Sequence, residues 1–266
     1  MKLKEILIIT YYDLKIFFRY KINIIWLIVT PVIFTLIGAV VINVMGMERF
    51  IETTGGSGSG SLYVMVGFAV FSLANYCWQS GGKIETEMMM GTAKSNFLLP
   101  IKRSSYIYGL SLSTILSTVS VSLLQFFAAA YIVKASVRNL VISFLLLIIS
   151  VIYFLGISLV VSSVSLAYKR VGNLANILTF LLQLLTGLMI PIRSLPKAMQ
   201  YICYLCPTTW AIDSVRSSLL GLTPILPLWV EACILIVAVV IVNALGQWLI
   251  HSSEIKMQRD GLLETY

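Results

Sequence analysis

Six long stretches without Lys, Arg, Asp or Glu constrain this chain of 266 residues more than any other feature of its sequence. Each stretch holds between 22 and 30 residues. Because about 20 residues of helix cross the hydrocarbon core of a bilayer, each stretch predicts one transmembrane helix. The six predicted spans are Ile22–Gly46, Leu62–Gly82, Ser105–Val133, Leu140–Tyr168, Val171–Ile192 and Pro227–Ile250.

The composition excludes a soluble domain. Charged residues make up 11% of the chain and hydrophobic residues 59%, whereas soluble domains carry about 25% charged residues. Most of the surface must therefore face lipid, and we predict an all-α polytopic membrane protein with one transmembrane domain, residues 1–266. The net charge of +8 does not indicate a nucleic-acid partner, because the basic residues lie between apolar stretches rather than among aromatic residues on a polar surface.

The distribution of Lys and Arg predicts the orientation of the chain. Thirteen of these residues lie in the N-terminal segment, the second-to-third and fourth-to-fifth connections and the C-terminal tail, and six lie on the other side. Short loops rich in Lys and Arg remain cytoplasmic. We therefore expect a multi-pass protein of the plasma membrane with both termini in the cytoplasm.

The N-terminal segment, residues 1–21, has a charged side and an apolar side. Lys4, Lys15 and Arg19 share one side of a helix. The opposite side carries Leu3, Ile6, Leu7, Leu14, Phe17 and Phe18. This pattern predicts an amphipathic helix that lies in the cytoplasmic interface of the membrane. The alternative is that the segment extends the first span.

The connection between the second and third spans, residues 83–104, is longer than a crossing requires. It combines two acidic residues, Glu85 and Glu87, with several apolar side chains that are costly to leave in water. These apolar residues are Met88, Met89, Met90, Phe97, Leu98 and Leu99. Since methionine adapts to irregular grooves in a partner, we predict a docking element here, with a plain solvated loop as the alternative.

The connection between the fifth and sixth spans, residues 194–226, is broken by prolines into short apolar pieces. Leu195–Leu205 and Trp210–Leu220 hold about 11 residues each, which is too short to span a bilayer. They predict a re-entrant helical hairpin on the outer side. Asp213 and Arg216 lie three residues apart on the second piece and can pair on one face.

These features together resemble the membrane subunit of type-2 ABC exporters over nearly the whole chain. The most specific part lies within Gly187–Arg216 and consists of Pro191, Leu195, Pro196, Pro207, Trp210, Asp213 and Arg216. The second part is the connection after the second span, with Glu85, Gly91, Thr92, Leu99, Pro100 and Arg103.

The resemblance implies a permease half-unit that pairs with a second half-unit and moves an amphipathic substrate (a drug, lipid, glycan or peptide) out of the cytoplasm. It implies that ATP and Mg²⁺ bind a separate ABC ATPase subunit and that this chain carries no cofactor. A cytoplasmic coupling helix would contact that ATPase through Glu85, Glu87, Met90, Gly91, Thr92 and Phe97. The re-entrant hairpin would form an outer gate from Pro191, Pro196, Pro207, Trp210, Asp213 and Arg216.

The chain carries no recognisable catalytic or metal site of its own. An ATP-binding loop of the form G-x-x-x-x-G-K-[ST] has its nearest counterpart at Ser80–Ile84, which lacks the first glycine and the final hydroxyl. One histidine, His251, is too few for a zinc site or a Ser–His–Asp set. Cys203 and Cys206 are spaced as C-x-x-C, and a disulfide between them stays open.

Uncharged polar side chains form stripes along two predicted spans. The stripe residues that we assign to a substrate path are Asn75, Gln79, Asn176, Thr179 and Gln183. Hydrogen bonds between packed helices are the alternative role. Glu231 is the one acid inside a predicted span and lies near its outer end. The alternative function, an ion-coupled secondary transporter or channel, needs ionisable groups near the membrane midplane, and an enzyme acting on lipid needs a catalytic cluster that the spans lack.

Overall fold

The structure is a computed structural model that describes residues 3–54, 60–92, 96, 101–168 and 172–260. These residues form helices and their connections and contain no strand. The elements are α1 (Leu3–Arg19), α2 (Lys21–Met45), α3 (Met47–Thr54), α4 (Gly60–Cys77), α5 (Gln79–Met89), α7 (Arg103–Val133), α8 (Val137–Tyr168), α9 (Gly172–Leu185), η1 (Ile192–Ser194), α10 (Lys197–Leu205), α11 (Pro207–Leu220) and α12 (Leu228–Asp260).

Five helices of the described chain are long and apolar enough to cross a membrane, which confirms the predicted all-α polytopic fold. Their bounds are Lys21–Val44, Gly60–Met89, Arg103–Val133, Val137–Tyr168 and Leu228–Ser253. The predicted fifth span, Val171–Ile192, contains only the 14-residue helix α9. The count of six spans therefore stays a prediction.

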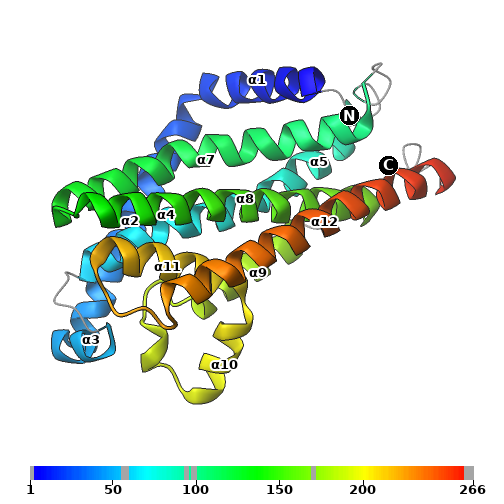
Figure 1. Cartoon of the computed structure of the whole chain (residues 1–266). Helices are drawn as coiled ribbons and strands as arrows, with labels where there is room; N and C mark the ends of the chain where they lie inside the picture. Colours follow the sequence, from blue (N-terminus) through cyan, green and yellow to red (C-terminus); the bar gives the residue numbers. More distant parts are fainter. Residues whose placement is uncertain (1–2, 55–59, 93–95, 97–100, 169–171, 261–266) are drawn as a thin grey trace.

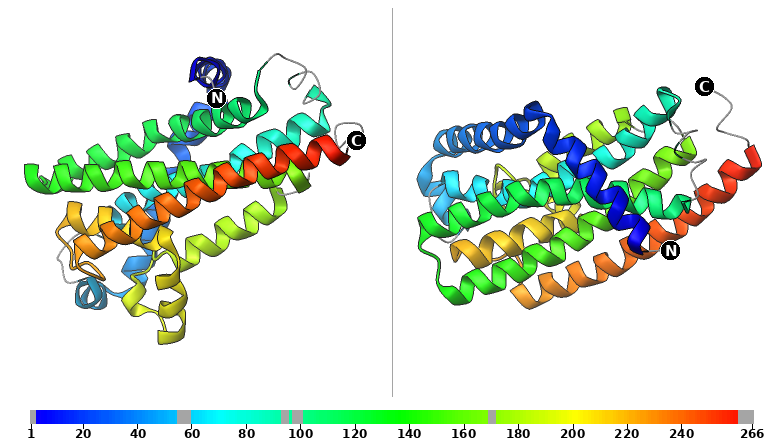
Figure 2. Two further views of the ribbon diagram at one scale, coloured as in Figure 1. Left: turned by 45° about the vertical axis from the view of Figure 1, so that its right-hand side comes forward. Right: turned by 90° about the horizontal axis from the view of Figure 1, so that it is seen from above.

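The long helices run side by side, and their ends define two ends of the molecule (Figure 1). Helix α1 begins and α12 ends at the end where α5 stops and α7 starts, which we call the α5–α7 end. Helix α3 and the turn between α11 and α12 lie toward the opposite end, the α11–α12 end. The two views of Figure 2 show α1 turning away from α2 and lying against α7.

The turn at Tyr20 separates α1 from α2. Tyr20 has extended backbone angles, φ −88° and ψ 102°, and caps the start of α2. The buried side of α1 includes Ile6 and Thr10, whose hydroxyl donates to the Ile6 carbonyl and to the Gly109 carbonyl of α7 at 3.2 Å. The N-terminal segment is thus a separate helix packed on α7, rather than a continuation of the first span.

Two predicted span boundaries differ from the structure. The second span was predicted to end at Gly82, but helix continues to Met89, so the first part of the 83–104 connection is helical. Only a turn at Trp78 separates α4 from α5. The helix stops before Gly91, whose φ of +72° lies in the left-handed region that favours glycine.

The second difference is the early end of α9. Helix α9 stops at Leu185, seven residues before the predicted boundary at Ile192. Gly187 has a φ of +67°, and Pro191 follows without an N–H to donate. Both residues break the helix locally, although the apolar sequence continues through them.

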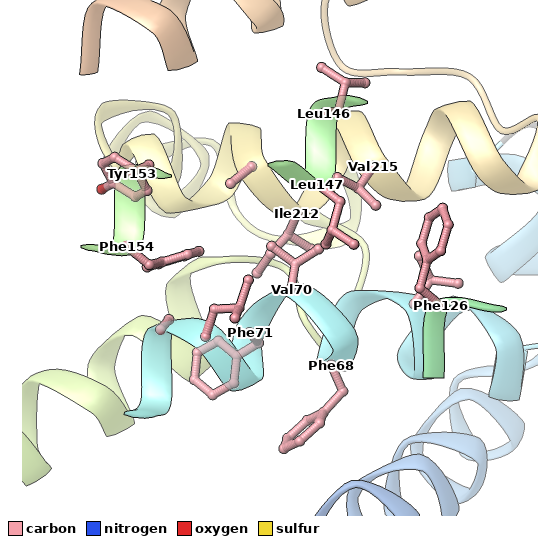
Figure 3. Close-up of a cluster of buried hydrophobic side chains, with 14 of the residues drawn as sticks. Phe68, Val70, Phe71, Phe126, Leu146, Leu147, Tyr153, Phe154, Ile212 and Val215 are labelled. Atoms are coloured by element: carbon pink, nitrogen blue, oxygen red, sulfur yellow. The ribbon is translucent and has the colours of Figure 1, made fainter. Parts of the chain in front are cut away.

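The main apolar core lies between α4, α7, α8 and α11 (Figure 3). Helix α4 is the central element, since it packs against α2, α7, α8 and α11. The core side chains labelled in Figure 3 are Phe68, Val70, Phe71, Phe126, Leu146, Leu147, Tyr153, Phe154, Ile212 and Val215. A smaller buried cluster at the α5–α7 end joins α5, α7, α8 and α12, and its members are Ile84, Met88, Ile107, Leu110, Leu159, Leu166 and Ile250.

Close packing of α5 on α8 predicts different outcomes at two adjacent glycines. A Cβ at Gly81 would meet the Ser165 hydroxyl and the Val161 side chain, whereas a Cβ at Gly82 has open space. We expect Gly81→Val to destabilise the protein by about 1–3 kcal/mol because the packed neighbours must move. Gly82→Val is the matched control, with the same loss of glycine and the same helix, and should change the thermal midpoint little. Equal melting temperatures of the two variants in detergent would contradict this packing.

Candidate functional site

The end of α5 is fixed to α7 by one glutamate. Glu87 accepts a hydrogen bond from the Tyr106 hydroxyl at 2.6 Å and from the Asn96 amide at 3.4 Å. The same Asn96 amide donates to the Tyr106 oxygen at 3.0 Å. Glu87 is a half-buried residue. It therefore connects the end of α5 both to α7 and to Asn96 within the 83–104 connection.

The methionine run divides between the core and the surface. Met88 is buried in the small cluster of the α5–α7 end, whereas Met89 is 54% exposed and Met90 72% exposed. Gly91 and Thr92 are exposed, and the Thr92 hydroxyl donates to the Glu87 carbonyl at 3.2 Å. The predicted docking surface thus begins with two apolar side chains at the tip of a rigid helix.

Two predicted coupling residues add less to this surface. Glu85 is half-buried and has interactions of its own. Phe97 lies outside the described residues, as do Leu98 and Leu99. The surface that the structure describes is therefore carried by Met89, Met90 and the turn that follows them.

An ion pair that the sequence analysis did not anticipate connects α1 to this end of the molecule. The Lys83 ammonium group of α5 lies 2.6 Å from the Asp13 carboxylate of α1. Asp13 also accepts a hydrogen bond from the Ser113 hydroxyl of α7. The only sequence signal was the position of Asp13 between the basic residues of the N-terminal segment. The three side chains join α1, α5 and α7 beside Glu87.

Two of the predicted path residues line one cleft. Asn75 of α4 and Gln79 of α5 line a cleft of about 350 Å³ together with Phe17 and with Asn23 and Trp26 of α2. Asn75 is half-buried and Gln79 is exposed. The cleft lies where α1 meets α2 and where α4 meets α5. It brings amide groups and aromatic rings to a single surface.

The three predicted path residues of α9 do not join this cleft. Asn176 is exposed, and Thr179 and Gln183 are half-buried. None of the three is among the described residues that line the cleft. Helix α9 packs only lightly, on α4, α5 and α10, and much of its surface remains uncovered by this chain.

Arg216 organises the α11–α12 end. It is 2% exposed, and its guanidinium group donates to the carbonyl of Gly187 at 3.0 Å and to the carbonyl of Leu188 at 3.4 Å. Its Cζ lies 3.7 Å from the centre of the Tyr63 ring, and the Tyr63 hydroxyl also donates to the Gly187 carbonyl. We call these four residues the arginine junction. It satisfies carbonyls left free where α9 ends.

The predicted pairing of Asp213 with Arg216 is wrong. The described residues contain no ion pair between them. Asp213 instead accepts a hydrogen bond from the Ile225 N–H at 2.9 Å. Both side chains line a small cavity of about 20 Å³. Spacing along α11 placed the two residues on one side of the helix, but neighbouring segments supplied better-aligned partners.

The prolines and Trp210 shape the predicted hairpin. Pro191 precedes η1, Pro196 precedes α10 and Pro207 is the first residue of α11, a position that needs no backbone N–H. Trp210 is 5% exposed, stacks on Tyr204 and donates its indole N–H to the Tyr204 carbonyl at 3.0 Å. The predicted hairpin helices are therefore present, separated by a corner at Cys206.

The cysteines of that corner are free thiols in the structure. Cys203 is buried and Cys206 half-buried. Burial raises the pKa of the Cys203 thiol, with the neighbouring Cys206 adding to the effect. The described residues contain no group of three His, Cys, Asp or Glu side chains that would hold a metal ion. His251 is exposed, and the Glu254 side chain lies outside the description.

Comparison with known proteins assigns the chain to a family. The family model named ABC-2 type transporter matches residues 4–220, from the first turn of α1 to the last residue of α11. A comparison with individually curated proteins returns no significant match. Because the family match covers most of the chain, the resemblance inferred from the sequence is confirmed. The chain therefore belongs to the ABC-2 type transporter family, as a membrane-spanning permease subunit.

Proposed function

We propose that this chain is the permease half-unit of an ATP-driven exporter and that a separate ABC ATPase subunit, with its ATP and Mg²⁺, supplies the energy. The family match over residues 4–220 is the observation that carries this proposal. The sequence offers no phosphate-binding loop of the Walker type, so hydrolysis is assigned to another polypeptide. The cargo class is an amphipathic molecule such as a drug, lipid, glycan or peptide.

The α5–α7 end is suited to receive force from an ATPase. Met89 and Met90 are exposed at the tip of α5, and α4 and α5 form one rod from Gly60 to Met89. Glu87 attaches the tip to α7, and Lys83 attaches it to α1 through Asp13. A displacement of the tip would therefore move α1, α4 and α7 together rather than bend a loop.

The cleft at Asn75 and Gln79 is our candidate for the inner part of the substrate path. Its volume of about 350 Å³ falls within the range of small-molecule sites, about 300–1,000 Å³. Amide groups and the Trp26 and Phe17 rings suit a molecule with both polar and apolar parts. We assign the other wall of the path to α9 of a second half-unit, since an exposed Asn176 is costly to leave in lipid.

The arrangement of the helices supports a sixth crossing. Helices α8 and α12 run in the same direction, so the chain ends α8 at the α5–α7 end and begins α12 toward the other (Figure 1). The segment between them must return across the molecule, and α9 is its first helix. We propose that α9 and the residues up to Ile192 make this crossing. Six crossings place both termini on one side, which the Lys and Arg distribution assigns to the cytoplasm of a plasma-membrane protein.

Reconstitution tests this proposal. The chain is co-expressed with candidate ABC ATPases of its source, purified and placed in liposomes with labelled amphipathic substrates. We expect stable co-purification with one ATPase, and transport that requires ATP and is lost when the Walker lysine of the ATPase is replaced. Equal transport by the permease alone under an imposed ion gradient would overturn the proposal in favour of an ion-coupled carrier.

A further inference from the structure

The turn between α11 and α12 is held by two carboxyl groups. The Ile225 N–H donates to Asp213 of α11 at 2.9 Å, and the next N–H, that of Leu226, donates to Glu231 of α12 at 3.0 Å. Two adjacent peptide N–H groups of the turn thus bind carboxyl groups from two different helices. The two carboxyl groups lie within hydrogen-bonding reach of each other.

Glu231 is the less expected member of this pair. It is 0% exposed although it lies in the first turn of α12, near the outer end of a predicted span. Its second oxygen, Oε2, is buried, and no N–H or O–H of the described chain donates to it. A buried carboxylate oxygen without a donor is costly. A carboxyl proton between Asp213 and Glu231 would remove that cost.

The charged groups around Asp213 and Glu231 do not replace such a proton. Arg193 of η1 is exposed and donates to the Thr223 hydroxyl at 3.0 Å and to the Pro224 carbonyl at 2.7 Å. Arg216 is committed to the arginine junction. The remaining titratable groups facing Asp213 are the phenols of Tyr63 on α4 and Tyr204 on α10. Among the described residues, no ion pair neutralises either acid.

We propose that Asp213 and Glu231 form a binding site for one shared proton, and that this proton latches the α11–α12 turn. Two carboxyl groups in contact do not both ionise readily, because the second charge is repelled by the first and solvated poorly. Loss of the proton would place two negative charges side by side and push α11 and α12 apart at the turn. This inference goes beyond the proposed export function and holds whatever the cargo or energy source.

The sign of the pH effect follows from proton linkage. In the unfolded chain both acids ionise near their ordinary values of about 4, whereas the folded pair retains one proton. Unfolding then releases a proton, and stability falls as the pH rises. Glu231→Gln keeps the shape and supplies a permanent amide donor to Asp213, so it should retain stability and lose this part of the pH dependence.

The experiment combines infrared spectroscopy with thermal unfolding of the whole chain in detergent, from about pH 5 to about pH 9, a range above the ordinary carboxyl values. We expect the wild-type protein to show the carbonyl stretch of a protonated carboxylic acid at neutral pH, and Glu231→Gln and Asp213→Asn each to remove it. Glu52→Gln, at an exposed acid of α3, is the matched control and should leave the band unchanged.

Three results would overturn the proposal, and the first two concern the proton itself. One is the absence of a protonated-carboxyl band from the wild-type protein at neutral pH. The other is a parallel fall of the melting temperatures of wild type and Glu231→Gln as the pH rises. Stabilisation of the wild type by Ca²⁺ or Mg²⁺ at alkaline pH, lost in both variants, would assign the pair to a cation and would also overturn it. Asp213→Asn provides the same comparison if Glu231→Gln does not fold.

Discussion

Arg216→Met should lower the free energy of unfolding by about 2–4 kcal/mol, because a buried carbonyl that loses its donor costs about 1–3 kcal/mol. The substitution leaves the carbonyls of Gly187 and Leu188 without their guanidinium donor and removes the cation from the Tyr63 ring. The side chain is 2% exposed, so water cannot replace the lost donor without a rearrangement. Thermal unfolding in detergent measures the effect.

Two further variants make this result specific to the arginine junction. Arg138→Met, at an exposed arginine near the start of α8, is the matched control and should change stability by less than about 0.5 kcal/mol. Gly67→Ala approaches the junction from α4, because its Cβ would meet the Arg216 guanidinium group. We expect it to be destabilising as well. Similar melting temperatures for Arg216→Met and Arg138→Met would contradict the role assigned to Arg216.

The second large effect is expected at the tip of α5. Replacing both Met89 and Met90 with glutamate should reduce ATP-dependent transport at least tenfold, since a loss of about 1.4 kcal/mol in the contact already corresponds to a factor of ten. Both side chains are more than half exposed and lie outside the buried cluster that contains Met88. The folded permease should therefore keep its melting temperature while ATPase co-purification and transport decline.

Leucine at the same two positions is the matched control. Met89→Leu with Met90→Leu keeps the apolar surface and similar volumes, so co-purification and transport should remain close to wild type. Full transport by the double glutamate variant would show that the ATPase contacts another surface. A melting temperature reduced as strongly as transport would indicate a structural role for these residues instead of a docking role.

Local sequence features predicted much of the helix layout. The predicted hairpin pieces Leu195–Leu205 and Trp210–Leu220 correspond to α10 and α11, because proline restricts the backbone wherever it occurs. The lengths of the apolar stretches predicted six spanning helices, and five of these correspond to described helices that are long and apolar enough to span a membrane. The end of α9 was missed because an apolar run continues through Gly187, and a hydrophobicity count does not register a change of φ.

The candidate site was predicted less completely, since its contacts join distant segments. Sequence reasoning selected Glu87 and Met90 as coupling residues, which stays a prediction, and it did not show that Glu87 would be held by Tyr106 or that Lys83 would pair with Asp13. Helical spacing suggested Asp213 and Arg216 as partners. Helical spacing carries no information about carbonyl groups of another segment. Arg216 donates to such a carbonyl, that of Gly187, instead of pairing with Asp213.

The sequence by itself determined that this chain is an α-helical membrane protein, because a chain with so few charges can satisfy its backbone in lipid only through internal hydrogen bonds. The tertiary structure alone decided which polar groups are buried and which partners they meet. The hydrogen bond from Arg216 to the Gly187 carbonyl depends on where α9 ends. The burial of Glu231 depends on the conformation of the α11–α12 turn. Such contacts are selected by the packing of whole helices, which no local pattern encodes.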